Sequence, residues 1–335
     1  MSDPGQYHPH HPRVSIVIPT LNRAALVGRA IASALSQSYR DLEIIVSNNG
    51  STDDTREVMG RFADPRLRIF HRDVTIPACE HGNFLISQAR GEFFIGLSDD
   101  DYLEKDFIAK CVAHFDTYPN LSFVYTGCWI YYNDLATRAL TGPLVESGVD
   151  FMAAVFAGQR DVCWCACVVR TSHLRTIGEI PPGNLFGDMF YWTRMAFMGN
   201  VGCIPEPLSN YIAFNSNWVN VSTGVSILEW ARESQKIISE ACRVVCQFNP
   251  TRQNISKIRR DADAYVARSV AKRFVLKAIN SGKSRDLLYS LLPTLPYLRY
   301  GSFNDLKGIA AALLLPRKLL WILFVRFYKK RYIQN

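Results

Sequence analysis

The stretch Phe93-Phe94-Ile95-Gly96-Leu97-Ser98-Asp99-Asp100-Asp101 decides the fold prediction for this chain of 335 residues. A short apolar run that ends in polar residues is typical of a buried strand. The three carboxylates then emerge together at its carboxyl end, where open α/β sheets hold their ligands. Carboxylates this close repel one another, so we expect Mg²⁺ or Mn²⁺, bridged to a phosphate, to neutralise them. The alternative is that they cap a helix over residues 102–115.

Apolar runs and helical spacings alternate outward from this stretch. We predict strands over residues 13–19, 42–46, 67–70 and 92–97, with helices over 24–36 and 83–89. Strands that alternate with helices build a mostly parallel sheet flanked by helices, so the fold class is α/β. No Gly-x-Gly-x-x-Gly motif follows the first strand, which disfavours a dinucleotide-binding fold.

The charge of the chain is unevenly distributed. Residues 251–335 contain 18 Lys and Arg but only 4 Asp, a net charge of +14, which leaves −6 for the first 250 residues because the total is +8. Opposite charges of this size indicate segments with different roles. We predict a flexible tail over residues 1–12, an α/β domain over 13–225 and a basic helical extension over 226–335.

The nine cysteines are an odd number without a disulfide framework, and no apolar leader follows a basic start at the N-terminus. Both features favour a reducing, cytoplasmic location. Cys163, Cys165 and Cys167 alternate in a run that predicts a strand over residues 162–169, and we expect them to pack in the core rather than bind zinc.

Three further motifs surround the predicted strands. Pro19-Thr20-Leu21-Asn22-Arg23 follows the first strand, Asn48-Asn49-Gly50-Ser51-Thr52-Asp53 follows the second, and Ala89-Arg90-Gly91-Glu92 precedes the acidic stretch. In this order and spacing the chain resembles family 2 of the inverting glycosyltransferases, which have the Rossmann-like GT-A fold. The resemblance covers residues 13–215.

The resemblance implies transfer of a sugar from a nucleotide diphosphate to a hydroxyl of a glycan or a lipid-linked glycan, as in cell-surface polysaccharide assembly. One alternative is a catalytically silent nucleotide-sugar-binding protein of the same fold. Another is a sugar-phosphate nucleotidyltransferase, although such an enzyme should open with a Gly-rich basic loop, which residues 19–23 are not.

The resemblance also assigns site residues. The residues expected to bind the donor nucleotide are Pro19, Thr20, Leu21, Asn22, Arg23, Asn48, Asn83, Asp99 and Asp100. Asp100 and Asp101 are the expected metal ligands. Asp188 precedes a helix predicted over residues 189–198 and is the expected catalytic base, with capping of that helix as its other role. Trp192, four residues later on the same helix face, is the predicted acceptor contact, with core packing as the alternative.

Departures from the family pattern bear on the donor and the metal. Asn48 stands where the family has an aspartate that pairs with the base, and an amide both donates and accepts, so we expect a pyrimidine, with cytosine added to uracil and thymine. Phe214 stands where a histidine often binds the metal, which leaves weak or absent metal dependence open. Gly82 replaces a phosphate-binding arginine, for which Arg23 or Arg90 is the candidate substitute.

The C-terminal end is apolar and basic. Residues 309–315 and 319–325 are apolar but are split by Pro316-Arg317-Lys318, so a spanning helix would pay roughly 5–7 kcal/mol for two central charges. We therefore predict a peripheral helix on the cytoplasmic face of a bacterial-type inner membrane, with Arg326, Lys329, Lys330 and Arg331 against anionic headgroups. A helical subdomain packed on the core, or a homo-oligomer interface, is the alternative. Prolines predict interruptions at 249–250 and 293–296, and no nucleic-acid-binding module is present.

Overall fold

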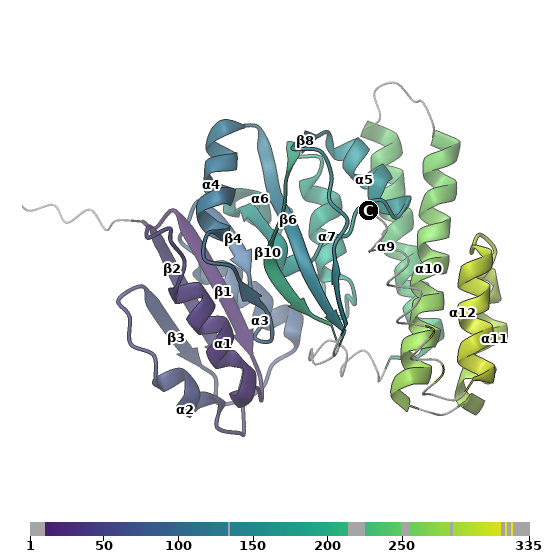
Figure 1. Cartoon of the computed structure of the whole chain (residues 1–335), viewed down its shortest axis with the longest axis horizontal. Helices are drawn as coiled ribbons and strands as arrows, with labels where there is room; N and C mark the ends of the chain where they lie inside the picture. Colours follow the sequence, from purple (N-terminus) through teal and green to yellow (C-terminus); the bar gives the residue numbers. More distant parts are fainter. Residues whose placement is uncertain are drawn as a thin grey trace, which may run out of the picture.

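A computed structural model describes residues 11–132, 135–213, 225–248, 255–281 and 284–315, together with Leu319 and Leu323. A twisted sheet with helices on both faces forms one end of the molecule, and long helices form the other end (Figure 1). Of the predicted N-terminal tail, residues 1–10 lie outside the described part of the chain.

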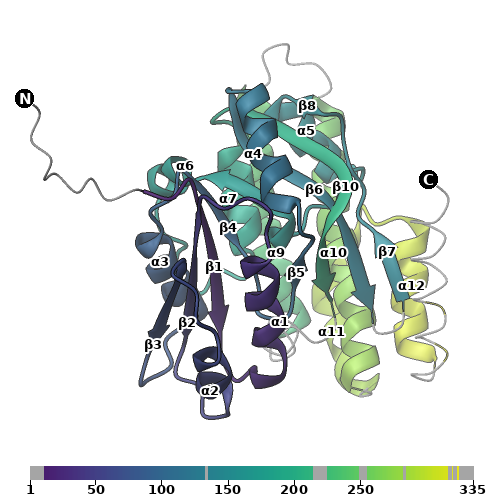
Figure 2. The same cartoon turned by 60° about the vertical axis from the view of Figure 1, so that its left-hand side comes forward.

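The sheet begins with four parallel strands. They are β1 (Val14–Thr20), β2 (Leu42–Asn48), β3 (Leu67–His71) and β4 (Phe93–Gly96), in the order β3-β2-β1-β4. Figure 2 shows β1, β2 and β3 side by side and running the same way. Every residue of β2 is buried, as expected for a parallel strand covered by helices on both faces. The four strands predicted from apolar runs are confirmed.

The remaining strands make the second half of the sheet mixed. They are β9 (Cys167–Arg170), β6 (Leu121–Tyr132), β10 (Asn200–Ile212) and β5 (Tyr102–Leu103), with β7 (Leu135–Arg138) and β8 (Val145–Glu146) at the margins. β9 runs antiparallel to both of its neighbours, while β6 and β10 are parallel to each other. The predicted α/β class with a mostly parallel sheet is confirmed.

Seven helices of the described residues belong to the sheet-bearing part. They are α1 (Ala24–Leu35), α2 (Thr55–Gly60), α3 (Ala78–Gln88), α4 (Phe107–Thr117), α5 (Gly148–Phe156), α6 (Thr171–Ile177) and α7 (Gly187–Met195). In Figure 1, α1 and α4 lie in front of the sheet and α3, α6 and α7 behind it. Gln37 joins the two front helices, because its side-chain Oε1 accepts from the N–H of Ile108 at 3.1 Å.

The helix predicted directly behind the aspartates begins later than expected. Tyr102 and Leu103 form β5 and pair with Ser209 and Asn210 of β10, and α4 starts at Phe107 after the N-cap residue Asp106. Pairing with a strand more than 100 residues away thus overrides the local helical pattern. The alternative interpretation, that the three aspartates cap a helix, is therefore wrong.

The cysteine-rich segment also differs from its predicted structure. Residues Trp164–Ala166 form a short 3₁₀ helix, η1, and only Cys167 onward belongs to strand β9. All nine cysteines are free thiols, and Cys165 and Cys167 are buried in the core, as expected.

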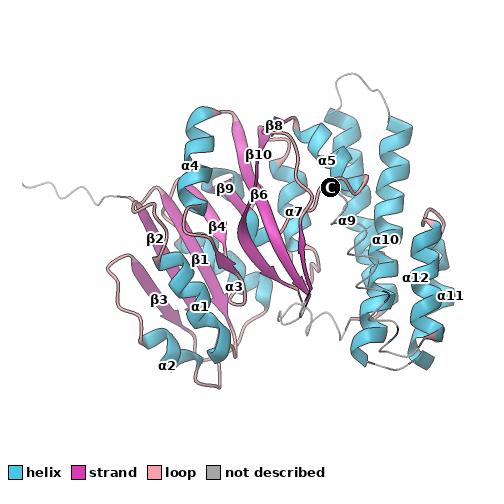
Figure 3. Ribbon diagram, viewed as in Figure 1, coloured by secondary structure: helices cyan, strands magenta, loops and turns pink. Residues whose placement is uncertain are grey.

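The C-terminal part consists of long helices that pack on the sheet-bearing part (Figure 3). They are α9 (Ile227–Phe248), α10 (Ile255–Ser281), α11 (Ser284–Leu298) and α12 (Phe303–Leu314). α9 packs on α5 and α7, and α10 packs on α5, α9, α11 and α12. An ion pair of 2.7 Å joins Arg194 of α7 to Glu240 of α9. The described part of the extension is thus a helical unit packed on the core.

Two prolines lie inside α11, where the sequence predicted an interruption. Pro293 and Pro296 lack the N–H groups that would bond the carbonyls of Tyr289 and Leu292, and both of those residues are exposed, so water can bond the carbonyls instead. The predicted break at 293–296 is therefore wrong. The predicted break at 249–250 lies outside the described residues. Within the described chain, no helix is both long and apolar enough to cross a bilayer.

Candidate active site

The predicted donor-binding residues meet at the carboxyl edge of the parallel strands. Thr20 at the end of β1 lies opposite Asn48 at the end of β2, and β4 ends at Gly96, just before the aspartates. The sheet thereby gathers three loops that are distant in sequence.

The first two of these loops are joined by hydrogen bonds. Asn22 has a left-handed backbone with φ of 54°, and its Oδ1 accepts from the N–H of Thr52 at 2.8 Å. The N–H of Arg23 donates to Thr55 Oγ1 at 2.8 Å. Asp53 Oδ2 accepts from the N–H of Ala24 at 3.2 Å, so the second loop caps the first turn of α1. Asn22 and Asp53 therefore fix the shape of the site.

Asn48 is buried, and the oxygen of its side-chain amide already accepts a hydrogen bond. Its Oδ1 accepts from the N–H of Ser51 at 2.9 Å, which identifies the Nδ2 group as the part of the amide that makes no hydrogen bond within the described residues. Asn49 turns the other way and bonds both backbone groups of Ile76. Asn48 thus keeps the N–H groups of its amide available to a ligand.

The three aspartates are almost completely buried beside Arg23. Burial raises the pKa of Asp99 to about 6, while the Thr20 hydroxyl and the Arg23 guanidinium oppose the shift. Burial also raises the pKa of Asp100, against the charges of Arg23 and Arg29. Arg23 Nε and Nη2 are buried and make no hydrogen bond to any described residue. A buried guanidinium without a partner beside buried carboxylates is typical of a site that binds an anion together with a cation.

Asp101 already makes a hydrogen bond within the protein. Its Oδ1 accepts from the N–H of Ile212 at 2.8 Å, and burial and the neighbouring Asp100 raise its pKa. By contrast, Asp99 Oδ2 and Asp100 Oδ2 are buried without hydrogen-bond partners within the described chain. The geometry therefore favours Asp99 and Asp100 as metal ligands over the predicted pair Asp100 and Asp101.

Two free carboxylate oxygens fit a divalent cation that a substrate helps to hold. Mg²⁺ typically takes one or two carboxylates and completes its shell with substrate phosphates and water. Across the described residues, no group of three or more His, Cys, Asp or Glu side chains is arranged to hold a metal ion alone. Phe214, the residue at the expected histidine position, lies outside the described residues.

Asp188 lies in the first turn of α7 and is exposed to solvent. The protein atoms around its carboxyl desolvate it and raise its pKa, although Oδ1 accepts from the N–H of Met189 at 2.8 Å. Burial and the charges of its neighbours, Asp101 and Asp188 among them, raise the pKa of the Tyr211 phenol of β10. Asp188 is therefore a solvent-accessible carboxylate that acts on the same phenol as Asp101, and it also bonds a free N–H of α7.

The aromatic side chains next to Asp188 divide into buried and accessible ones. Trp192 is only 6% exposed, which argues against the predicted acceptor contact. Trp164 is half-buried and stacks on Tyr191, with ring centroids 5.9 Å apart. Its indole Nε1 lies so close to Gly96 that a Cβ there would be 2.1 Å away. Trp164 is thus the better candidate for a sugar contact.

Two other predicted residues of the donor site are bonded within the protein, and one further residue was missed. Asn83 bonds the backbone of Ile180 through both ends of its amide, so it positions the loop before α7. Arg90 pairs with Glu43 at 2.8 Å, near the amino end of β1, and does not replace the missing phosphate contact. Sequence reasoning missed Arg72, whose N–H donates to the Asn48 carbonyl and whose Nε has no partner among the described residues. Its position directly after β3 was the available signal.

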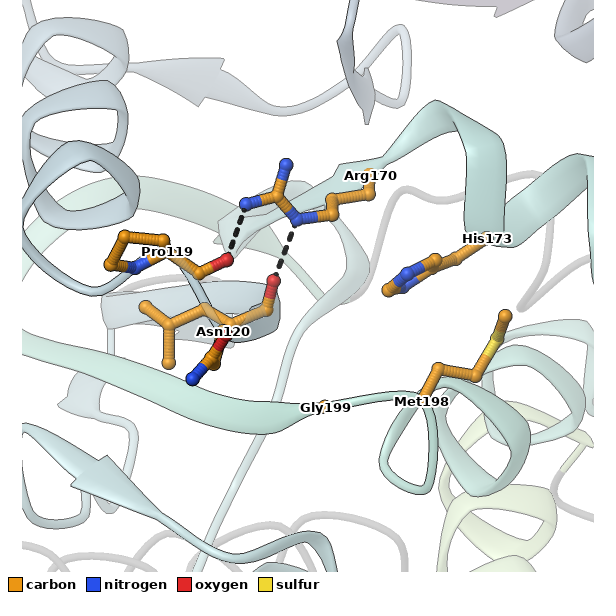
Figure 4. A pocket seen from close by; sticks show the side chains of 7 residues that line it. Pro119, Asn120, Arg170, His173, Met198 and Gly199 are labelled. Atoms are coloured by element: carbon orange, nitrogen blue, oxygen red, sulfur yellow. Dashed lines mark hydrogen bonds between the residues drawn. The ribbon is translucent and has the colours of Figure 1, made fainter.

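A pocket of about 340 Å³ lies at the opposite edge of the sheet (Figure 4). Arg170 in its wall pairs with Phe93 at the amino end of β4, and its guanidinium donates to the carbonyls of Leu121 at 2.8 Å and Pro119 at 2.9 Å. Because Arg170 lies at the amino end of β4 and the aspartates follow its carboxyl end, the pocket is separate from the site of the aspartates.

The chain is also similar in sequence to known proteins. The chain is 31% identical over 156 residues to the GalNAc(5)-diNAcBac-PP-undecaprenol beta-1,3-glucosyltransferase of Campylobacter jejuni, which covers 44% of this chain and 50% of that protein. The curated relatives extend beyond the match, since the chain spans 12% to 51% of their length.

Solved structures share the fold at low sequence identity. The crystal structure of S. aureus TarS 1–349 in complex with UDP-GlcNAc superposes with a TM-score of 0.62 at 15% identity, over 94% of this chain and 88% of that one. The mannosyltransferase PcManGT of Pyrobaculum calidifontis, in complex with GDP-Man and Mn²⁺, gives 0.56 at 18% identity, over 97% and 88%. The family model described as glycosyl transferase family 2 matches residues 15–177. This segment, with its mostly parallel sheet and its acidic stretch behind β4, therefore belongs to glycosyl transferase family 2 and has the GT-A fold.

Proposed function

We propose that the protein is an inverting glycosyltransferase that moves a sugar from a nucleotide diphosphate to a hydroxyl of a glycan or lipid-linked glycan. The observation that carries the proposal is that one carboxylate oxygen each of Asp99 and Asp100 and two guanidinium nitrogens of Arg23 are buried without hydrogen-bond partners in the described chain. In this proposal residues 13–225 are the catalytic domain and residues 226–335 are the helical extension.

The reaction is a single displacement. The acceptor oxygen bonds to the anomeric carbon while the bond from that carbon to the diphosphate breaks, and Asp188 takes the acceptor proton. The raised pKa of Asp188 makes its carboxylate a stronger base than an ordinary aspartate. Arg23 donates hydrogen bonds to the departing nucleoside diphosphate. Asp99 and Asp100 would hold Mg²⁺ or Mn²⁺, which neutralises charge on that leaving group.

The nucleotide base is proposed to be a pyrimidine. By the resemblance of its loop, Asn48 meets the base, and its Nδ2 group is the part left free by the bond to Ser51. An N–H donor fits the carbonyl oxygens of uracil and thymine or N3 of cytosine, whereas the paired N1–H and N2 amino donors of guanine require an acceptor such as a carboxylate. TarS was crystallised with UDP-GlcNAc and PcManGT with GDP-Man, so the fold itself admits either kind of base.

Ligand-induced stabilisation tests the donor site. A ligand at 100 times its Kd stabilises the native state by about 2.7 kcal/mol and raises Tm. We expect a UDP-, dTDP- or CDP-sugar to raise Tm. The rise in Tm should be larger in the presence of Mn²⁺ than in the presence of EDTA. The matched variant Asp100→Asn should lose the Mn²⁺-dependent part of the shift. Tightest binding of a GDP-sugar would contradict the proposed base, and no shift with any donor would contradict the proposed function.

The acceptor is proposed to be a lipid-linked glycan at the cytoplasmic face of the inner membrane, with the protein bound peripherally. The support is the name of the Campylobacter relative, which acts on an undecaprenol-linked glycan, and the charge of +14 on residues 251–335. The sequence predicts membrane contact for the C-terminal end of the chain. Of its residues 316–335, the structure describes only Leu319 and Leu323.

A further inference from the structure

Helices α11 and α12 expose large apolar side chains. Six of them, each between 47% and 79% exposed, are called the apolar face here: Tyr289, Leu292, Leu295, Phe303, Leu306 and Leu314. The residues on α11 recur every three positions, and Ala310 fills the gap between Leu306 and Leu314 on α12. Each set therefore lies along one side of its helix.

The apolar face is additional to the apolar residues that hold these helices in place. α11 buries Leu287 and Leu298, and α12 buries Ile309 and Ala312, where the two helices pack on α10. In Figure 1 the pair lies at the end of the molecule farthest from β3. Large exposed apolar patches are rare on soluble proteins and mark interaction surfaces.

Positive charge accompanies the apolar face. Lys307 Nζ lies 4.3 Å from the centroid of the Phe303 ring, and Arg299 is exposed at the end of α11. An apolar helix surface with basic residues beside it is the pattern of helices that lie in a bilayer interface.

Charge also distinguishes between the two candidate partners of this face, a second copy of the chain and a lipid surface. Residues 251–335 carry a net +14, so a second copy of the chain would bring two strongly positive segments together. An anionic lipid surface instead attracts such a segment. We propose that the apolar face, with Arg299 and Lys307 beside it, docks on an anionic lipid bilayer with α11 and α12 parallel to the membrane plane. This inference does not depend on sugar transfer.

Vesicle co-sedimentation of the full chain tests the proposal. We expect binding to vesicles of phosphatidylcholine with 40% phosphatidylglycerol, at least about tenfold weaker binding to pure phosphatidylcholine, and weakening by salt. The triple variant Leu292→Gln, Phe303→Gln, Leu306→Gln should bind anionic vesicles at least about tenfold more weakly. The matched control Val74→Gln, Leu144→Gln removes exposed apolar side chains elsewhere and should bind like wild type.

Two outcomes would overturn the inference. One is equal sedimentation of the triple variant and wild type, with unchanged circular dichroism and Tm. The other is a lipid-free dimer in sedimentation velocity that the triple variant abolishes, which would assign the face to a second copy. The donor-induced Tm shift of the triple variant should equal that of wild type, so failure of this inference and failure of the proposed function remain distinguishable.

Discussion

Substitution of Gly96 by alanine tests whether Trp164 is held where the reaction needs it. A Cβ at Gly96 would lie 2.1 Å from Trp164 Nε1, whereas an uncompressed contact needs roughly 3.5 Å, so the indole must move by about 1.4 Å. Tyr191 stacks on the same ring at 5.9 Å and Trp192 lies at 6.4 Å, which restricts the movement. We expect Gly96→Ala to lower the free energy of unfolding by about 1–3 kcal/mol. A displacement of about 1 Å beside the reacting sugar should lower kcat/KM roughly 100-fold.

The assay combines urea unfolding, followed by tryptophan fluorescence, with turnover of the donor that the Tm panel identifies. Gly82→Ala is the matched control, because no atom lies within 4 Å of its new Cβ and alanine favours the interior of α3. It should stabilise the protein by up to about 1 kcal/mol and leave turnover unchanged. If Gly96→Ala matched wild type in both stability and turnover, the assigned position of Trp164 would be refuted.

Three further predictions concern charged residues. Burial would raise the pKa of Glu43, but hydrogen bonds from Arg90, Ser15 and Arg68 lower it below its usual 4.5. Glu43→Gln should therefore cost about 2–3 kcal/mol at pH 7, and the difference from wild type in urea unfolding should shrink as pH falls through the folded pKa. Because the protein atoms around its carboxyl desolvate Asp188 and raise its pKa, kcat should begin to fall with acid at a pH above that of an ordinary aspartate, and a pH–rate profile that stays flat to pH 4 would argue against its role as the base. Arg23→Met should weaken donor binding, measured by calorimetry, by about tenfold or more without a matching loss of Tm, because Nε and Nη2 make no hydrogen bond within the described chain. Unchanged donor affinity in this variant would remove Arg23 from the site.

The sheet was predictable where the sequence pattern is local. The strands ending at Thr20, Asn48 and Gly96 are near-continuous apolar runs, and a polar residue follows each within two positions. Because the carboxyl ends of parallel strands lie at one edge of a sheet, the acids were expected beside the loops that follow the first two strands. The predicted start of α4 was wrong because Tyr102 and Leu103 pair with residues of β10. A pairing between residues so far apart in sequence leaves no signal in the local pattern.

The roles within the site depended on contacts that the sequence does not display. Asp101 and Ile212 are 111 residues apart, and Asn83 and Ile180 are 97 apart. Neither hydrogen bond can therefore be predicted from the spacing of residues in the sequence. Trp192 was predicted from helix periodicity, which identifies a face but not what covers it. Arg72 was missed because its position directly after β3 is a signal only once β3 is known to pair with β2 as far as Asn48.

The central claim is that Asp188 drives sugar transfer at a donor site built from Asp99, Asp100 and Arg23. The most direct test is release of nucleoside diphosphate from the identified donor, with acceptor glycan present, by wild type and Asp188→Asn. The account predicts that the variant binds donor with a Kd within about threefold of wild type and releases product about 10²–10⁴-fold more slowly. Equal release by the two proteins would contradict the account.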